Sequence, residues 1–414
     1  MSLRIGLKTL GCKQNQFDTE ALRKLLQNHH HTVRHPKEAD WFILNTCAVT
    51  QRALAKARGE VRALKRRYPA LKIIALGCGV KYQPHNFSEA DSLNLEPLGL
   101  GEESRVNPDR DPGPPHGLLP LGKSRALLRI QSGCNETCAY CVVPLLRGRS
   151  RSVPLNECVD AVASLQGTDV SEISLTGTNI ACWGNDLPGR PGLQMLVEAL
   201  LVAAGPAVRL RLSSLEPGSI TPDFLDWCAK EPGVCDHFHF AFQSGSPRVL
   251  SCMRRPTISR EIIAYLKDLK KRRPDFCLGS DFIVGFPGER ADDIEETIRW
   301  IRSIPLDYLH VFPFSPREGT RAYELSDRMD LNLRIAGVRL FSELNVELKN
   351  AFIKSNIGTI QNMVIITKNN MNRLRALSSN YLTISLPLST FAPNPENRNF
   401  KLKIEGDHSI QLQK

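Results

Sequence analysis

Three cysteines in one short segment have the most specific chemical spacing in this sequence. Cys134, Cys138 and Cys141 form a CxxxCxxC pattern within residues 132–144 (SGCNETCAYCVVP). Three thiolates bind three irons of a 4Fe-4S cube, which leaves the fourth iron open to another ligand. An open coordination position distinguishes a reactive metal centre from a structural one. The pattern therefore predicts a catalytic iron–sulfur site.

A structural zinc site is the alternative interpretation of the same three cysteines. Zinc in structural sites takes four ligands, so a histidine such as His116 or His237 would have to complete the set. The residue types alone leave this alternative open.

A second group of cysteines follows predicted strands in the first eighty residues. Cys12, Cys47 and Cys78 stand in LGC, NTC and LGC contexts, each just beyond an apolar run. Because strand ends of one polarity share an edge in a parallel sheet, these cysteines are predicted to converge and bind a second cluster. The alternative is three separate buried thiols, since cysteine is often buried. The remaining six show no ligand spacing and are assigned to packing: Cys158, Cys182, Cys228, Cys235, Cys252 and Cys277.

The elements that position the second group form an α/β pattern. Apolar runs at residues 4–10, 41–45 and 71–76 alternate with helical patterns at 17–28 and 51–67, which predicts an open parallel α/β domain over residues 1–84. Residues 85–123 are rich in proline, glycine and charge, above all at 107–117, and are predicted to be a linker.

The first group precedes a longer series of strand and helix patterns. Helical stretches at 155–165, 193–203 and 292–302 separate six apolar runs, at residues 127–130, 172–175, 208–212, 237–242, 280–284 and 308–314. This order predicts a partial (βα)6 barrel over residues 124–344, whose reactive groups lie at the carboxyl ends of the strands. Residues 345–414 contain two short strand patterns, 363–366 and 381–386, and predict a small basic β domain, with a solvated tail as the alternative.

Composition narrows the class of protein. The 414 residues suit two or three domains, and a net charge of +11 favours a polyanionic partner such as nucleic acid. No apolar run is long enough for a membrane span. Arg4 and Lys8 place charges where a signal peptide would have its apolar centre. We therefore expect a cytoplasmic protein without a membrane partner. In that compartment twelve cysteines are expected to be reduced rather than paired.

The cysteine segment resembles the signature of radical S-adenosylmethionine enzymes, which carry an aromatic residue before the last cysteine, here Tyr140. The resemblance implies that S-adenosylmethionine binds the open iron and that its reductive cleavage gives a 5′-deoxyadenosyl radical. It also implies a reductant such as flavodoxin or ferredoxin. Tyr140 is accordingly a candidate cofactor contact.

Nearly the whole chain is similar to the methylthiotransferases within that superfamily. The matching stretches include KTLGCKQNQFDTE from Lys8, NTCAVT from Asn45, SLTGTNI from Ser174, DFIVGFPGE from Asp281 and HVFPFSPREGT from His310. The resemblance implies two 4Fe-4S clusters and tRNA as partner. It points most to the branch that converts threonylcarbamoyladenosine beside the anticodon to its 2-methylthio derivative. Methylthiolation of isopentenyladenosine or of a ribosomal-protein aspartate, and a non-catalytic metal-stabilised RNA-binding module, are the alternatives.

Two further sets of candidate residues come from the resemblance. Contacts to S-adenosylmethionine are expected at strand ends, although residues of these types also serve as plain turns and caps: Thr176, Gly177, Ser213, Gln243 and Gly285. The last segment resembles the RNA-binding β-barrel called TRAM, whose phosphate contacts would come from Lys368, Arg373, Arg375, Lys401 and Lys403. The oligomeric state, the tRNAs and the sulfur source are not specified by the sequence.

Overall fold

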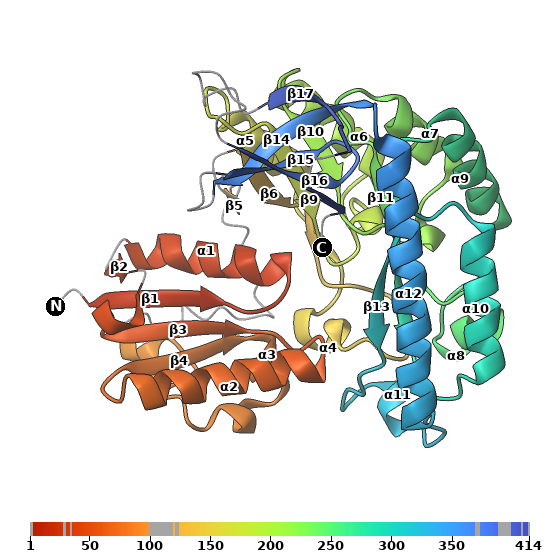
Figure 1. Ribbon diagram of the computed structural model, residues 1–414. Coiled ribbons are helices and arrows are strands. Elements are labelled where there is room, and N and C mark those ends of the chain that lie inside the picture. Colours follow the sequence, from red (N-terminus) through yellow and green to blue (C-terminus); the bar gives the residue numbers. More distant parts are fainter. Residues whose placement is uncertain are drawn as a thin grey trace. The chain divides into compact units, whose positions relative to one another are not determined.

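The computed structural model describes residues 3–27, 30–33, 35–98, 119–120, 124–368, 373–387, 399–406 and 409–412. The chain divides into two compact units, which we call the amino-terminal unit and the barrel unit (Figure 1). The amino-terminal unit contains Met1–Leu119, Ser132–Arg151 and Ser315–Tyr323. The barrel unit contains Pro120–Gln131, Ser152–Phe314 and Glu324–Lys414.

A four-stranded parallel sheet forms the centre of the amino-terminal unit. Its order is β2 (His31–Val33), β1 (Arg4–Thr9), β3 (Trp41–Thr46) and β4 (Lys72–Gly77). Helix α1 (Lys13–Gln27) covers one face, and α2 (Gln51–Arg67) and α3 (Cys78–Tyr82) cover the other (Figure 1). Successive side chains of a strand face opposite ways, so Ile43 packs with α1 while Phe42 and Leu44 pack with α2. The open parallel α/β domain predicted from the sequence is confirmed.

The segment after α3 packs onto this sheet. It forms two short 3-10 helices, η2 (Pro84–Phe87) and η3 (Glu96–Leu98), and buries Phe87, Leu95 and Leu98 in the two cores of the sheet. Residues 85–98, assigned to the linker above, are thus part of the amino-terminal unit, because these three apolar side chains cover its core. The proline-rich stretch 107–117, with His116, lies outside the described residues.

Six parallel strands form the partial barrel, as predicted. Strands β6 (Arg125–Arg129), β9 (Glu172–Thr176) and β10 (Arg209–Leu212) pair in one sheet, with β5 (Leu119–Pro120) at its edge. Strands β11 (His237–Gln243), β12 (Cys277–Val284) and β13 (Tyr308–Pro313) form a second sheet. Single bridges, Leu210 to Val234 and Leu215 to Phe240, connect the two sheets.

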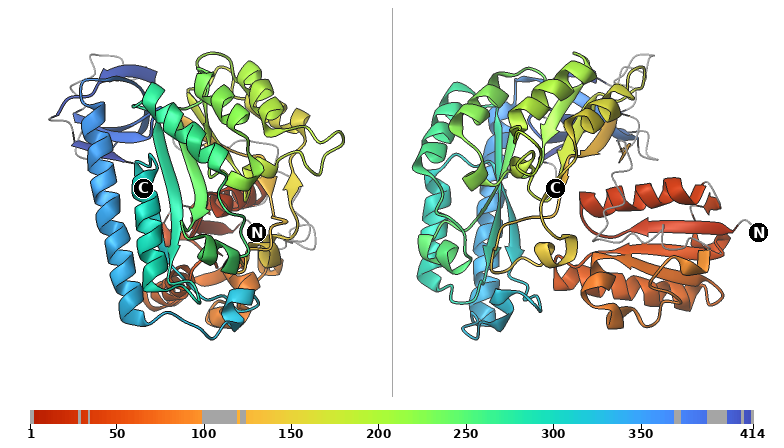
Figure 2. Two further views of the ribbon diagram at one scale, coloured as in Figure 1. Left: turned by 90° about the vertical axis from the view of Figure 1, so that its right-hand side faces the viewer. Right: turned by 180° about the vertical axis from the view of Figure 1, so that it is seen from behind.

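Helices between the strands cover the outside of the barrel (Figure 2). They are α5 (Leu155–Ala163), α6 (Leu193–Ala204), α7 (Pro222–Lys230), α8 (Pro247–Cys252), α9 (Arg260–Arg272) and α10 (Ala291–Ser303). The other short elements are β7 (Gln131–Ser132), α4 (Val143–Arg147), β8 (Arg151–Ser152), η5 (Ile180–Cys182), η6 (Pro217–Ser219), α11 (Arg321–Glu324) and, near the start of the chain, η1 (Pro36–Glu38). No helix among the described residues has the length and apolar content needed to cross a membrane.

The alternation along β12 shows which side chains face the barrel interior. The Phe282 ring packs 6.4 Å from Trp300 of α10 and 5.8 Å from Phe341 of α12 (Leu331–Asn356), measured between ring centroids. Its neighbour Asp281 therefore faces the opposite way, into the barrel. Gly279 shares the face of Asp281, and a Cβ there would lie 2.1 Å from the Tyr308 ring, so only glycine lets this ring lie against the strand.

The carboxyl-terminal part begins with the long helix α12 (Leu331–Asn356), which crosses the boundary expected at residue 345. An antiparallel sheet follows, in the order β17 (Asn399–Lys403), β14 (Ile360–Lys368), β15 (Arg373–Ser378), β16 (Leu382–Pro387) and β18 (Ser409–Leu412). The expected strands 363–366 and 381–386 correspond to β14 and β16. The small β domain is confirmed and the solvated tail is wrong.

Candidate active site

The three cysteines that follow amino-terminal strands converge at one edge of their sheet. Cys12 follows β1, Cys47 follows β3 and Cys78 follows β4, and these strands are neighbours. The Asn15 Oδ1 atom lies 3.7 Å from Cys12 Sγ and 3.9 Å from Cys78 Sγ. A Cβ on Gly11 would lie 3.0 Å from Cys47 Sγ. The structure thus brings together the set that we call the amino-terminal triad.

Glycine before the cysteine makes this convergence sterically feasible. Gly11 has a φ of +121° and Gly77 a φ of +90°, a region that side chains with a Cβ rarely adopt. A Cβ on Gly77 would also lie 2.0 Å from Asn45 Oδ1. The glycine in each LGC context therefore turns the chain sharply at the strand end and presents the next residue at the sheet edge.

The triad cysteines differ in burial, and this affects their thiols. Cys12 is exposed, Cys47 is buried and Cys78 is partly buried. Burial raises the pKa of Cys78 to about 11, against the opposing charge of Arg147, and it also raises the pKa of Cys47. Both thiols are therefore protonated in neutral solution without a metal. Bound iron would reverse this, because a metal ion deprotonates a coordinating thiol.

The loop that carries Cys134, Cys138 and Cys141, the loop triad, belongs to the same unit. Its start is fixed by the Cys134 N–H, which donates to the carbonyl of Gly148 at 3.1 Å. Its middle is fixed by the Ala139 carbonyl, which accepts from the Ala322 N–H at 2.8 Å. Ala139 and Val142 are buried while the three cysteines stay partly exposed. The loop is thus anchored by backbone hydrogen bonds and two buried apolar residues, while its cysteines are only partly buried.

Residues beside the two triads contact one another. The Arg147 guanidinium of α4, just after the loop, donates to Asn15 Oδ1 at 3.0 Å and to Asp18 Oδ2 at 2.9 Å. Ala48, Val142 and Leu146 form one buried cluster against which Cys78 packs. Residues next to Cys47 and next to Cys141 therefore touch the same apolar core.

The expected cofactor contacts lie where barrel strands end. Thr176 ends β9 and is followed by Gly177, Ser213 follows β10, Gln243 ends β11 and Gly285 follows β12. Gln243 has a φ of +69°, which is unusual for a residue with a side chain, at a point where the register between β11 and β12 shifts. All five lie at the carboxyl edge, which holds the reactive groups of such barrels. Tyr140 is partly buried in the loop between Cys138 and Cys141.

The turn after β12 contains a carboxyl group with an unusual environment. Glu289 is buried, and its Oε2 accepts from the N–H groups of Gly285 and Phe286. Burial raises the pKa of Glu289 to about 7, although both N–H groups oppose the rise. This carboxyl therefore fixes the glycine turn at the strand end.

A polar cluster inside the barrel was missed by the sequence analysis. Asp281 Oδ1 accepts from His239 Nε2 at 2.9 Å and from His310 Nδ1 at 3.2 Å, and we call these three residues the imidazole–carboxylate cluster. Asp281 and His310 are register partners on β12 and β13. Burial alone would raise the pKa of Asp281, but His239 and His310 lower it. The available sequence signal was a histidine or aspartate inside each of three largely apolar strands.

Below this cluster the barrel is filled by aromatic side chains. The Tyr308 hydroxyl contacts His239 Nδ1 at 2.8 Å and His237 Nε2 at 2.9 Å. Tyr381 stacks on the His237 ring with centroids 4.1 Å apart. His237, considered above as a zinc ligand, is thus buried in the barrel and engaged by Tyr308.

The expected RNA-binding residues differ in availability. Arg375, Lys401 and Lys403 are exposed on β15 and β17. Arg373 instead donates to the Ser385 hydroxyl at 3.0 Å and to its carbonyl at 2.9 Å. The side chain of Lys368 lies outside what the structure describes.

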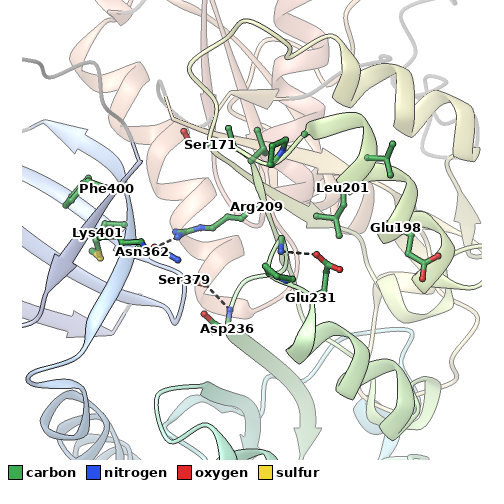
Figure 3. A pocket seen from close by; sticks show the side chains of 18 of the residues that line it. Ser171, Glu198, Leu201, Arg209, Glu231, Asp236, Asn362, Ser379, Phe400 and Lys401 are labelled. Atoms are coloured by element: carbon green, nitrogen blue, oxygen red, sulfur yellow. Dashed lines mark hydrogen bonds between the residues drawn. The ribbon is translucent and has the colours of Figure 1, made fainter.

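A pocket of about 980 Å³ lies at the amino-terminal ends of β10 and β11, between the barrel and the carboxyl-terminal sheet (Figure 3). Its lining includes Leu201, Trp227 and Lys401, and Arg209 crosses it to the Asn362 carbonyl at 2.8 Å. Since reactive groups of such barrels lie at the opposite strand ends, this pocket is not the candidate active site.

Comparisons with known proteins agree with this architecture. The radical SAM superfamily profile matches residues 128–301, and the profile of the uncharacterized protein family UPF0004 matches residues 4–95. The chain is 30% identical to the threonylcarbamoyladenosine tRNA methylthiotransferase MtaB of Aquifex aeolicus, over 92% of this chain and 96% of that protein. It is 32% identical to MtaB of Rickettsia prowazekii, over 89% of each. The chain belongs to the radical S-adenosylmethionine tRNA methylthiotransferase family.

Another relative acts on a different nucleoside. The chain is 29% identical to the tRNA-2-methylthio-N(6)-dimethylallyladenosine synthase of Neisseria meningitidis serogroup C, over 99% of this chain and 98% of that protein. Among solved structures, the radical S-adenosylmethionine methyltransferase TsrM of Kitasatospora setae has a TM-score of 0.55 at 12% identity, covering 78% of this chain and 75% of that chain. This last similarity concerns the fold alone.

The family assignment settles the class of protein. This methylthiotransferase is a tRNA-modifying transferase that uses S-adenosylmethionine and 4Fe-4S clusters. A non-catalytic RNA-binding module is therefore wrong. The donor chemistry fits the cofactor, because each triad offers three thiols, the ligand type of iron–sulfur clusters.

Proposed function

We propose that this methylthiotransferase converts threonylcarbamoyladenosine in tRNA to its 2-methylthio derivative. The loop triad holds the cluster that binds S-adenosylmethionine, and the amino-terminal triad holds a second cluster that carries the sulfur to be transferred. The observation that carries this proposal is the convergence of Cys12, Cys47 and Cys78 at one sheet edge. A single-cluster radical enzyme has no need for that second set of thiols.

Other residues have supporting roles in this proposal. Strand-end residues contact S-adenosylmethionine, together with Tyr140: Thr176, Gly177, Ser213, Gln243 and Gly285. Basic residues of the carboxyl-terminal sheet contact tRNA phosphates: Lys368, Arg373, Arg375, Lys401 and Lys403. Electrons come from a cytoplasmic donor such as flavodoxin or ferredoxin.

The choice of nucleoside rests on the barrel interior. Identities of 30–32% to one kind of relative and of 29% to the other do not separate the two substrates. The substituents do differ, because threonylcarbamoyl carries a carboxylate and a hydroxyl whereas dimethylallyl is a hydrocarbon. A site built for hydrogen bonding rejects an analogue that leaves its polar groups unpaired. The imidazole–carboxylate cluster therefore favours the threonylcarbamoyl group.

His310 is the most exposed member of the cluster. Exposure increases along β13 toward its carboxyl end, from Tyr308 at 1% to the His310 side chain at 32% and Phe312 at 42%. Asp281 holds Nδ1 of His310, which leaves Nε2 for a ligand. We therefore assign His310 to the polar end of the substrate's substituent.

Product analysis tests the nucleoside. Anaerobically reconstituted enzyme is incubated with S-adenosylmethionine, reductant and tRNA carrying either threonylcarbamoyladenosine or dimethylallyladenosine. The tRNA is then digested, and the masses of its nucleosides are measured by mass spectrometry. We expect methylthio mass on the threonylcarbamoyl nucleoside. Methylthio product from the dimethylallyl tRNA alone would contradict the proposed substrate and retain only the family activity.

The variant His310→Phe tests the recognition role separately. Loss of one hydrogen bond to a charged group costs about 1.5–3 kcal/mol, so kcat/KM for the threonylcarbamoyl tRNA is expected to fall roughly 10–150-fold. His310→Gln, which keeps a donor, should lose less. Release of 5′-deoxyadenosine without tRNA is the control and should not change. Equal kcat/KM in the Phe variant and the parent would exclude His310 from recognition.

A further inference from the structure

Arg317 is a buried cation whose donors are largely unused. Its side chain is 1% exposed, in the segment Ser315–Tyr323 of the amino-terminal unit. Its Nη2 makes a long contact of 3.4 Å with Ser315 Oγ. Its Nε and Nη1 have no hydrogen-bond partner among the described residues. Arginine is rarely buried this fully without pairing, so this position requires an explanation.

The surroundings of Arg317 point to the amino-terminal triad. The guanidinium lies over the ring of Tyr82, 5.6 Å from its centroid. Tyr82 packs with Cys78 against the same apolar cluster, which includes Ala48. Arg317 also interacts electrostatically with the Cys47 thiol. The buried charge therefore lies near Cys47, and its neighbour Tyr82 packs against the same cluster as Cys78.

The second arginine near this triad is paired. Arg147 contacts Asn15 and forms an ion pair with Asp18 at 2.9 Å. Arg317 has no carboxylate partner among the described residues, and burial lowers its pKa despite the opposing effects of Tyr82 and Cys47. A buried charge without a partner strongly destabilises a fold. Because no carboxylate of the described residues pairs with Arg317, we expect its partner to be an anion that is not part of the polypeptide.

We propose that Arg317 is the counter-charge of the iron–sulfur cluster held by the amino-terminal triad, with its free N–H groups donating to that cluster's sulfur atoms. The inference rests on the proposed function, which places a cluster there. Three thiolates make a 4Fe-4S cluster anionic, and reduction adds one further negative charge. Hydrogen bonds to sulfur and nearby positive charge raise a cluster's reduction potential. Arg317 is thus a positioning residue that favours the reduced cluster.

The test isolates this cluster in the full chain. Ala at positions 134, 138 and 141 removes the loop cluster, and about four irons should then remain in the reconstituted protein. In this background Arg317→Met should shift the reduction midpoint to a more negative potential, whereas Arg317→Lys should stay closer to the parent. Arg66→Met, which removes an exposed arginine on α2, is the control and should leave the midpoint unchanged.

The iron-free protein gives an independent measurement. Without a cluster Arg317 is an unpaired buried charge, so Arg317→Met should raise the melting temperature of the iron-free form. Reconstitution should then stabilise the Met variant less than it stabilises the parent.

Each result bears on one of the two proposals. Full iron content with the parent's midpoint in Arg317→Met would overturn the role of Arg317 and leave the proposed function standing. A lower melting temperature of the iron-free Met variant would also overturn it. A parent background that binds no iron would remove both proposals. Iron loss in the Met variant that Arg317→Lys restores would support the role.

Discussion

An enzyme with Ala at positions 12, 47 and 78 is expected to release 5′-deoxyadenosine from S-adenosylmethionine but to form no methylthio nucleoside. The loop triad remains intact in this variant, so radical formation persists. The amino-terminal triad is gone, so no sulfur is available for transfer. An enzyme with Ala at positions 134, 138 and 141 is expected to yield neither product. The difference in 5′-deoxyadenosine release distinguishes a radical-forming site from a sulfur-carrying site.

Iron content gives the second measurement of the same prediction. The parent should contain about eight irons after anaerobic reconstitution, and either variant about four. Cys252→Ala is a matched control, because Cys252 is exposed on α8 and has no proposed role. About four irons in the parent would contradict the two-cluster arrangement and with it the sulfur transfer.

The strand framework and the convergence of Cys12, Cys47 and Cys78 were predictable because they depend on local signals. Apolar runs identified the six barrel strands to within a few residues, and the LGC and NTC contexts placed three cysteines at the ends of parallel strands. The three cysteines then converge because neighbouring parallel strands end at the same edge of a sheet. The glycine in each LGC context was a further local signal for a sharp turn at the strand end, which the sequence analysis did not use. Gly11 and Gly77 both have a positive φ.

The missed features depend on contacts between distant segments. His239, Asp281 and His310 come from three strands, and no spacing in the sequence connects them. Burial of Arg317 beside Tyr82 requires a segment more than two hundred residues away to close over α3. Strand β15 was missed because its alternating arginines and apolar residues (RLRALS) form too short a pattern. Contacts of this kind depend on tertiary packing, and local sequence propensity does not predict them.

Glu172→Gln is expected to cause the largest loss of stability in the barrel unit. Glu172 is fully buried at the start of β9, and its two oxygens accept from Arg125, Arg209 and Arg211 at 2.7–3.0 Å. Burial alone would raise the pKa of Glu172, but the charges of Arg211, Arg125 and Arg209 hold it well below its ordinary value. The carboxylate is therefore ionised at neutral pH, and it neutralises part of a buried cationic group.

The same arginines connect the barrel to the carboxyl-terminal sheet. Arg211 donates to the carbonyls of Ser378 and Ser379, at 2.9 and 3.0 Å, and Arg209 donates to the carbonyl of Leu377 at 3.0 Å. These carbonyls lie at the end of β15 and in the turn toward β16. Loss of the Glu172 charge should therefore also loosen the attachment of this sheet.

Breaking a buried ion pair by removing one partner costs about 3–5 kcal/mol, a large part of the roughly 5–15 kcal/mol that stabilises a typical domain. We therefore expect Glu172→Gln to unfold at markedly lower denaturant concentration and to make the carboxyl-terminal sheet sensitive to protease. Because the folded pKa is depressed, the stabilisation is fully present above the unfolded pKa of about 4.3 and is lost only as the pH falls below it. The gap between parent and variant should thus persist from pH 8 to pH 5.

The variant Glu343→Gln is the control, because it breaks an exposed ion pair with Arg339 and should not change the denaturant concentration at which the protein unfolds. A Glu172→Gln variant as stable as the parent would mean that the three guanidiniums are neutralised without this carboxylate.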